Sequence, residues 1–277
     1  MKHEPQQWVS DYQRDGYVVV KECLDPATLN RLREGIEKIT RNSHQLTPNL
    51  RVHVHYETDF KKLQPDTNEL SEERLGSAVK LIMELPMFDP VFAELILYPP
   101  LLDVLEALFG TGEFSFHNYK AIIKSPRVSS SFVWHRDLPY LQHTSPNLIT
   151  ALLCLDDMSE ANGATVVLPG THRIPHEQVE QSDVNIPESG LPPITEVPRV
   201  TVKCPAGSAV LFHTCIIHGG GANRSDIPRR NIISIWSGPQ TYSAIPHRFA
   251  YQDLMPRSQD PERQKQVRMA FPKMPAT

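Results

Sequence analysis

The sequence predicts a single α+β domain that is mainly β, with a sandwich or jelly-roll core and flanking helices. Helical patterns are concentrated in residues 1–110, whereas short β-prone runs separated by turn residues begin at Glu113. No internal repeat or long linker divides the 277 residues. We therefore expect one domain over residues 1–277, with a helical N-terminal part of about 1–110 and a jelly-roll core of about 113–250.

The N-terminal segment combines a short strand with an amphipathic helix. Tyr17–Val20 is a β-like run, and the Asp25-Pro26 pair that follows is typical of a helix N-cap and first turn. Apolar residues then recur at steps of three and four, which predicts one stripe that packs against the main body. These residues are Leu29, Leu32, Ile36 and Ile39.

Residues 43–75 are polar and irregular, which predicts a surface loop, with a lid or binding loop as the alternative. A second helical region follows this stretch. Asp89-Pro90 indicates a helix start and Pro99-Pro100 a break, and Leu101–Phe109 reads as an apolar helix ended by Gly110.

The second half of the chain supplies the strands of the expected core. Seven or eight strands with few helical patterns between them favour a sandwich or jelly roll. The runs are Phe114–Ile123, Phe132–Trp134, Leu148–Leu155, Thr165–Leu168, Val200–Val202, Ser208–Phe212 and Asn231–Trp236. Residues 175–198 read as a long insertion between strands, and Asp260–Met269 as a polar segment prone to form a helix.

The composition is that of an ordinary globular protein. Apolar residues make up 40% and charged residues 22%, and the formal net charge of -4 gives no electrostatic reason to bind nucleic acid or an anionic membrane. No stretch approaches the roughly 18 apolar residues of a membrane span, and the N-terminus lacks the apolar run of a signal peptide. We expect a soluble cytoplasmic protein, monomeric or homodimeric, with a small-molecule partner.

The four cysteines show no Cys-x-x-Cys spacing and lie in apolar or β-like segments. Buried free thiols are therefore expected rather than disulfides or nucleophiles. They are Cys23, Cys154, Cys204 and Cys215.

A candidate metal motif, His135-Arg136-Asp137, follows the β-like run Phe132–Trp134. Residues two apart on a strand point to the same side, so both side chains can reach one metal ion. Two histidines and one carboxylate are the ligand set of non-haem iron(II) centres that activate dioxygen. The motif alone is weak, because 12 histidines and 32 acidic residues predict about one such triplet by chance, and His55-Tyr56-Glu57 is another.

A third ligand is expected far downstream, in the run from Phe212 to Gly221. His218 ends an apolar stretch and precedes three glycines, where a strand can deliver a ligand while the backbone turns away. His213 competes with it, and spacing alone leaves the two near even odds.

These pieces together resemble the phytanoyl-CoA dioxygenase-like family of iron(II) and 2-oxoglutarate-dependent oxygenases. The resemblance covers nearly the whole chain. In order, it is carried by Asp15-Gly16-Tyr17, Lys124-Ser125-Pro126, Trp134-His135-Arg136-Asp137, Asn162-Gly163, Leu168-Pro169-Gly170-Thr171-His172, Gly207-Ser208, His218-Gly219-Gly220-Gly221-Ala222-Asn223 and Arg229-Arg230. Asn162-Gly163 and Pro169-Gly170 read as tight turns, with His172 belonging to the latter turn rather than to the metal.

The resemblance implies a double-stranded β-helix, or jelly roll, with His135, Asp137 and His218 as iron(II) ligands. It also implies that Arg229, eleven residues after His218, binds the far carboxylate of 2-oxoglutarate. A guanidinium fork suits that bidentate pair, and Arg230 is the fallback. Lys120 is given a secondary role toward 2-oxoglutarate.

The implied activity is that of an oxidoreductase, a dioxygenase that consumes O2 and 2-oxoglutarate, releases succinate and CO2 and hydroxylates a C–H bond of a small polar metabolite. Asp137 favours oxygenation over halogenation, because halogenating relatives replace this carboxylate with a small residue. Residues near the metal strands or on the potential lid are candidate substrate contacts: His117, Asn118, Trp134, Tyr140 and His55. Their cationic and hydrogen-bonding groups favour a polar, even anionic, substrate.

Two other readings stay open. A cupin-type isomerase or ring-cleaving dioxygenase uses similar ligands without 2-oxoglutarate, but such sites more often add a third histidine and lack the late arginine. A silent binding module that kept the fold would show a lost ligand or arginine, and neither is missing here.

Overall fold

Two antiparallel sheets form the core of the computed structural model, which describes residues 5–60, 71–179, 185–193 and 195–272. The larger sheet has the strand order β1-β9-β6-β11-β4-β3-β2. Its strands are β1 (Tyr17–Val20), β2 (Val54–Tyr56), β3 (Val79–Met83), β4 (Ser115–Lys124), β6 (Leu148–Cys154), β9 (Ala209–His213) and β11 (Arg229–Ser237).

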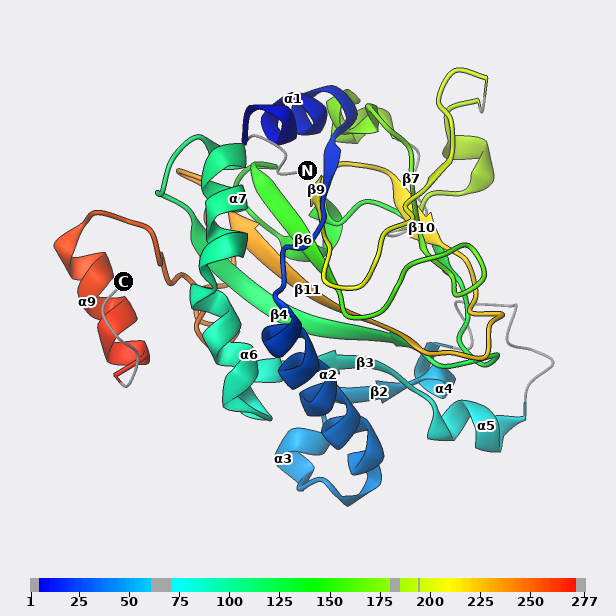
Figure 1. Cartoon of the computed structure of the whole chain (residues 1–277). Coiled ribbons are helices and arrows are strands. Elements are labelled where there is room, and N and C mark those ends of the chain that lie inside the picture. Colours follow the sequence, from blue (N-terminus) through cyan, green and yellow to red (C-terminus); the bar gives the residue numbers. More distant parts are fainter. Residues whose placement is uncertain (1–4, 61–70, 180–184, 194, 273–277) are drawn as a thin grey trace.

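The smaller sheet has the order β5-β10-β7-β8 and faces one side of the larger sheet (Figure 1). It consists of β5 (Phe132–His135), β7 (Thr165–Val167), β8 (Val200–Thr201) and β10 (His218–Gly220). Two packed antiparallel sheets are the jelly-roll arrangement, so the expected fold class is confirmed.

Helices cover the opposite side of the larger sheet (Figure 1). They are α1 (Pro5–Asp15), α2 (Pro26–Arg41), α6 (Pro90–Glu94) and α7 (Pro99–Phe109). The main hydrophobic core lies between these helices and the sheet, where Leu32 and Ile36 of α2 pack with Phe92 of α6 and Leu105 of α7. The amphipathic stripe predicted for residues 29–39 therefore faces the body of the protein.

The remaining helices are short or peripheral. They are α3 (Pro48–Arg51), α4 (Glu57–Phe60), α5 (Glu72–Ser77), α8 (Leu138–Leu141) and α9 (Pro261–Ala270), with 3-10 turns at Ser43–Gln45, Leu85–Met87, Leu95–Leu97, Thr171–Arg173, His176–Gln178 and Glu188–Gly190. Helix α9 stands at the edge of the molecule and buries none of its side chains fully. Within the described ranges, every helix is too short or too polar to cross a membrane.

The helix boundaries follow local chemistry. The Asp25 carboxylate accepts hydrogen bonds from the amides of Ala27 and Thr28, and that of Asp89 accepts one from Val91, so both expected N-caps are confirmed. Gly110 ends α7 with a φ of 72°, as predicted. Pro99-Pro100, read from the sequence as a break, occupies the first turn of α7. Amide groups in the first turn of a helix have no partner within the helix, so proline, which has no N–H group, fits there.

Alternate side chains of the central strand β4 face the hydrophobic core and the cavities between the two sheets. On β4, Tyr119, Ala121 and Ile123 belong to the helix-side core. The intervening Lys120 and Ile122 face the cavities between the two sheets. Because side chains of a strand alternate between faces, one strand can build the core and the site together.

The N-terminal part is less purely helical than its sequence indicated. Strand β1 pairs with β9, β3 pairs with β4, and β2 forms the sheet edge beside β3. Part of the stretch 43–75, interpreted as a loop or lid, is thus ordered as short helices and strand β2. The short length of β2 and the polar residues around it concealed it, and residues 61–70 of the same stretch lie outside the described structure.

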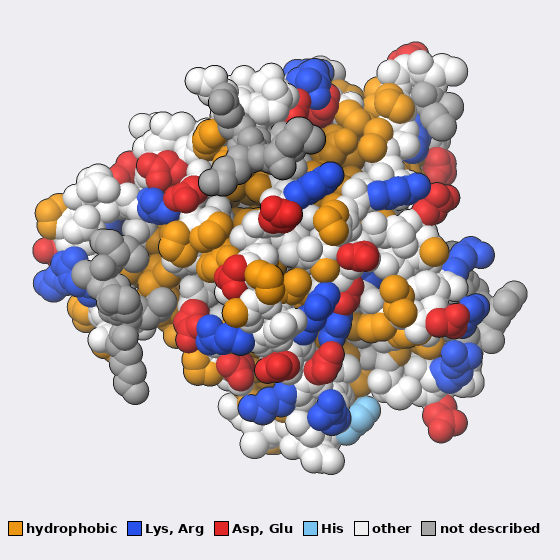
Figure 2. All heavy atoms as spheres, in the orientation of Figure 1, with side chains coloured by type: hydrophobic (Ala, Val, Ile, Leu, Met, Phe, Trp, Pro, Cys, Tyr) orange, Lys and Arg blue, Asp and Glu red, His pale blue; other side chains and the backbone are white. Residues whose placement is uncertain are grey.

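The charged surface is mixed on one face, and the cysteines are in the state predicted from the sequence. On the face shown in Figure 2, lysine and arginine side chains alternate with aspartate and glutamate and form no broad basic patch. All four cysteines are buried free thiols.

Candidate metal centre

His135, Asp137 and His218 converge between the two sheets. His135 ends β5 and His218 begins β10, and the two residues are direct partners in the antiparallel register. Their rings lie 4.2 Å apart between centroids, and each Nε2 atom is 3.9 Å from Oδ1 of Asp137. In the described part of the chain, these three residues form the group whose ligand atoms all lie within 4.8 Å of one another.

Backbone hydrogen bonds orient both imidazoles. His135 Nδ1 lies 2.8 Å from the carbonyl oxygen of Val133, and His218 Nδ1 lies 3.2 Å from that of Ile216. A carbonyl can only accept, so Nδ1 carries a proton in both rings and Nε2 is the atom that can ligate a metal. Burial and the neighbouring His218 lower the pKa of His135 to about 3, so its ring stays neutral and ready to ligate.

Asp137 is held by a residue of the opposite sheet. Thr150 on β6 donates a 2.6 Å hydrogen bond to Oδ2, which leaves Oδ1 facing the two histidines. Burial opposes ionisation, but His218, Lys120, His135 and this hydrogen bond outweigh it and keep the Asp137 pKa below its ordinary value. The site therefore offers two imidazole nitrogens and one carboxylate oxygen, a donor set that fits iron(II).

A small inner cavity of about 80 Å³ adjoins these ligands. Arg229, the first residue of β11, lies in its wall and is only 3% exposed. Its Nε has no hydrogen-bond partner, and no carboxylate among the described residues forms a salt bridge with it. Burial lowers the Arg229 pKa to about 10, so a desolvated cation without a counter-ion faces the cavity. A buried charge of this kind is stabilised when a carboxylate binds it.

The neighbouring Arg230 points elsewhere. Its guanidinium pairs with Asp156 at 2.7 Å and Glu37 at 2.6 Å, outside the cavity. Alternation along β11 thus separates the two arginines that the sequence places side by side. Lys120 lines the inner cavity together with Arg229, and its role toward the cosubstrate stays a prediction.

A larger outer chamber of about 350 Å³ opens on the other side of Lys120, His135 and Asp137, and shares these residues with the inner cavity. Three of the predicted substrate residues line it, namely His117, Asn118 and Tyr140.

The other two candidates do not line this chamber. Trp134 precedes His135 on β5, so its side chain lies on the opposite face, where its indole donates a 2.9 Å hydrogen bond to Glu188. His55 lies on β2 behind Phe60, with 6.5 Å between ring centroids, and it is Phe60 that reaches the chamber.

The site also contains residues that the sequence did not single out, some beside the metal ligands and some in the wall of the outer chamber. Thr150, which holds Asp137, comes from β6, whereas Arg248 and Phe249 come from the loop after β11. Leu81 and Met83 come from β3. None of these residues belongs to a recognisable motif, because sheet pairing across distant segments brings them together.

The competing histidines have other contacts. His213 lies at the end of β9, where its Nδ1 accepts a 3.0 Å hydrogen bond from the Cys215 amide and its ring neighbours His172. In the other candidate triplet, His55-Tyr56-Glu57, the Glu57 carboxylate pairs with buried Lys80 at 3.0 Å rather than with His55.

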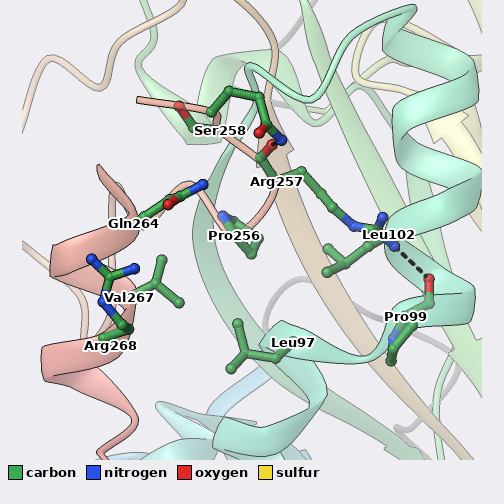
Figure 3. A pocket seen from close by; sticks show the side chains of 10 residues that line it. Leu97, Pro99, Leu102, Pro256, Arg257, Ser258, Gln264, Val267 and Arg268 are labelled. Atoms are coloured by element: carbon green, nitrogen blue, oxygen red, sulfur yellow. Dashed lines mark hydrogen bonds between the residues drawn. The ribbon is translucent and has the colours of Figure 1, made fainter. Parts of the chain in front are cut away.

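Another hollow lies far from these ligands, between α7 and α9 (Figure 3). Its walls include Leu97, Leu102, Val267 and Arg268. The metal-ligating residues all lie elsewhere, so the candidate site is the pair of spaces between the sheets.

Comparison with known proteins agrees with this geometry. A sequence model described as "Phytanoyl-CoA dioxygenase (PhyH)" matches residues 12–231. The chain belongs to the phytanoyl-CoA dioxygenase family. It is a non-haem iron dioxygenase that depends on 2-oxoglutarate.

Individual relatives and solved structures show the range of this resemblance. A probable phytanoyl-CoA dioxygenase of Caenorhabditis elegans is 29% identical over 234 residues, which cover 80% of this chain and 71% of the relative. An L-proline trans-4-hydroxylase of Streptomyces griseoviridis is 25% identical over 248 residues, covering 81% and 82%. The crystal structure of the epimerase SnoN with Fe3+, alpha ketoglutarate and nogalamycin RO is 18% identical and superposes with a TM-score of 0.69, covering 89% and 91%.

Proposed function

We propose that this protein hydroxylates an unactivated C–H bond of a small polar metabolite, with His135, Asp137 and His218 holding the iron and Arg229 holding 2-oxoglutarate. The observation that carries the proposal is the convergence of two Nε2 atoms and one carboxylate oxygen between a cavity lined by Arg229 and a larger chamber. Relatives named L-proline trans-4-hydroxylase and ectoine dioxygenase act on small molecules of this kind.

Each side chain has a defined task in this scheme. The two imidazoles direct their Nε2 atoms toward the metal position because backbone carbonyls accept hydrogen bonds from their Nδ1 atoms. Bound iron(II), together with 2-oxoglutarate, supplies the activation of dioxygen. Arg229 forms a bidentate pair with the far carboxylate of 2-oxoglutarate, and Lys120, which lines both spaces, adds positive charge beside it. The substrate then occupies the outer chamber, next to the ligands.

Among the residues that the structure describes, the metal group does not include the additional histidine that cupin-type sites usually have. His213 and His172 lie near each other, with 5.6 Å between ring centroids, and neither belongs to the ligand group. The buried, unpaired Arg229 instead favours a carboxylate-bearing cosubstrate.

The test is an anaerobic titration of the metal-free protein with iron(II) and then with 2-oxoglutarate. We expect the wild type to develop the weak visible charge-transfer band of the iron chelate. His218→Ala should abolish the band, whereas His213→Ala should keep it. A wild-type protein that binds iron but never forms the band would refute the cosubstrate assignment and favour the cupin-type reading.

The proposal also covers domain organisation, oligomeric state and location. The proposal includes one domain over residues 1–277, because β1, β2 and β3 belong to the same sheet as the later strands. It also includes a cytoplasmic monomer or homodimer that binds no nucleic acid or membrane. A single cooperative unfolding transition would support one domain, and light scattering after gel filtration distinguishes the two oligomeric states.

A further inference from the structure

The outer chamber has an uneven balance of charge. Among the described residues that line it, the cationic side chains are Lys80, Lys120 and Arg248. The one carboxylate among them, Asp137, belongs to the metal ligands. Lys80 is neutralised, because buried Glu57 pairs with it at 3.0 Å. No carboxylate in the described chain forms a salt bridge with Lys120 or Arg248. Among the described residues, Lys120 and Arg248 thus face the chamber with no salt bridge, and Asp137 is the one carboxylate in its wall.

Arg248 lies at the mouth of the chamber, on a loop that is closed by its own hydrogen bonds. The Oε1 atom of Gln252 accepts from the amides of Arg248 and Phe249 at 2.9 and 3.1 Å. Its Nε2 atom donates to the carbonyl of Ile245 at 3.2 Å. One buried amide therefore holds residues 245–252 in a fixed shape, with exposed Arg248 beside the ring of Phe249.

The same loop is tied to the sheet and carries backbone strain. Glu84, which follows β3, accepts a 2.9 Å hydrogen bond from the Ala250 amide. His247, Tyr251 and Asp253 all have positive φ angles, between 54° and 69°. Non-glycine residues in this region cost free energy and persist where the surrounding structure requires them, often at ligand sites. The loop is thus built to present Arg248 in one place.

Two buried polar groups in the chamber wall also lack partners. His117 and Asn118 are 4% and 6% exposed, and neither His117 Nδ1 nor Asn118 Oδ1 has a hydrogen bond within the described structure. Burial, followed by His143, Arg248 and Lys120, lowers the pKa of His117 to about 3, so this ring is neutral. The neutral His117 ring can form hydrogen bonds, and Lys120 and Arg248 supply positive potential around it.

The rest of the wall is largely apolar. Leu81, Met83, Ile122, Phe132 and Phe249 surround the space between Arg248 and the metal ligands. A volume of about 350 Å³ is near the lower end for small-molecule pockets. Such walls favour a carbon chain, whereas the unpaired arginine at the mouth favours an anion.

We infer that the substrate is a small carboxylic acid with an apolar carbon chain, whose carboxylate binds Arg248 while its chain extends over Phe249 and Ile122 toward the metal ligands. The planar guanidinium matches a carboxylate through two parallel hydrogen bonds, which a neutral amide cannot form. The inference rests on the proposed function and adds its substrate class.

The test measures binding to the protein loaded anaerobically with iron(II) and 2-oxoglutarate. Butanoate, hexanoate and octanoate are titrated by calorimetry, beside the primary amides and amines of the same chain lengths. We expect at least one acid to bind tenfold or more tightly than its amide, and the amines not to bind. Arg248→Gln should weaken acid binding at least tenfold, to the level of the amide, and leave amide binding unchanged. Arg248→Lys should fall between the two.

Arg268→Gln is the matched control, because Arg268 lies on α9 beside the other hollow (Figure 3). It should change none of these affinities. Equal binding of acid and amide, preferred binding of an amine, no binding by any acid, or an unchanged preference in Arg248→Gln would each overturn the inference while the chelate band remains. Loss of the band in the wild type would instead refute the proposed function itself, and the inference with it.

Discussion

Thr150 Oγ1 lies 2.6 Å from Asp137 Oδ2 and donates to it across the space between the two sheets. The hydroxyl is buried and belongs to β6, whereas the carboxylate follows β5. This contact ties the orientation of a proposed iron ligand to the larger sheet. It also directs the other carboxylate oxygen toward the two histidines.

Replacing Thr150 with valine keeps the shape of the side chain but removes this hydrogen bond. Loss of such supporting contacts typically weakens metal binding by about 10–100-fold, and we expect a decrease of that order in iron(II) affinity. Titration of the metal-free protein measures it. Thr40→Val, which removes a hydroxyl bound to the Ile36 carbonyl on α2, serves as the control and should bind iron normally. Unchanged iron affinity in Thr150→Val would contradict the role of this contact.

Arg229 and Arg230 make a matched pair for testing cosubstrate binding. Arg229→Ala should weaken 2-oxoglutarate binding at least tenfold, because the buried cation and its fork are lost. Arg229→Lys, which keeps the charge without the fork, should bind with intermediate affinity. Titration of the chelate band with 2-oxoglutarate gives all three values.

Arg230→Ala removes the ion pairs with Asp156 and Glu37 but leaves the inner cavity intact. It should lower the melting temperature without changing 2-oxoglutarate affinity. The assignment of Arg229 would be wrong if Arg230→Ala produced the larger loss of cosubstrate binding.

Gly163 and Gly110 both have positive φ angles but differ in their surroundings. A Cβ atom at Gly163 would lie 2.3 Å from the backbone oxygen of Gly221, whereas one at Gly110 would meet nothing within 4 Å. Gly110→Ala should therefore cost only the backbone strain, about 1–2 kcal/mol. Gly163→Ala should lose at least twice as much stability in urea unfolding, and should weaken 2-oxoglutarate binding because Gly163 lines the inner cavity. Equal losses would show that the backbone near Gly221 relaxes freely.

The Asp25 cap of α2 predicts a specific dependence of stability on pH. Hydrogen bonds from Thr28, Tyr98 and Ala27 lower the Asp25 pKa from 3.8 to about 2. A carboxyl group whose pKa is lowered on folding stabilises the protein fully above pH 3.8, and this contribution disappears as the pH falls through about 2. The melting temperature of Asp25→Ala should thus be below that of the wild type at pH 7, and the gap should narrow below pH 4.

Asp25→Asn provides the comparison, because asparagine caps a helix without titrating. The gap between Asp25→Asn and Asp25→Ala should stay constant over the same pH range. If the difference in melting temperature between the wild type and Asp25→Ala also stayed constant, ionisation of Asp25 would not contribute to the cap.

Much of the fold could be predicted because it depends on neighbouring residues. The cap at Asp25, the left-handed glycine at Gly110 and the β-prone runs that became β4, β6 and β11 all follow from chemistry within a few positions. Strands β2, β3 and β10 escaped prediction, because they are short and are stabilised by pairing with distant segments.

The sequence by itself determined most of the strand and helix pattern, the family and the proposed ligand types, since these depend on local chemistry and on the order of motifs. Spacing along the chain left His218 and His213 near even odds, and the tertiary structure brings only His218 beside His135. It likewise separated Arg229 from Arg230, placed Thr150 on Asp137 and turned Trp134 away from the chamber. The physical reason is that sheet register and strand alternation, which involve residues far apart in sequence, decide which side chains share one space.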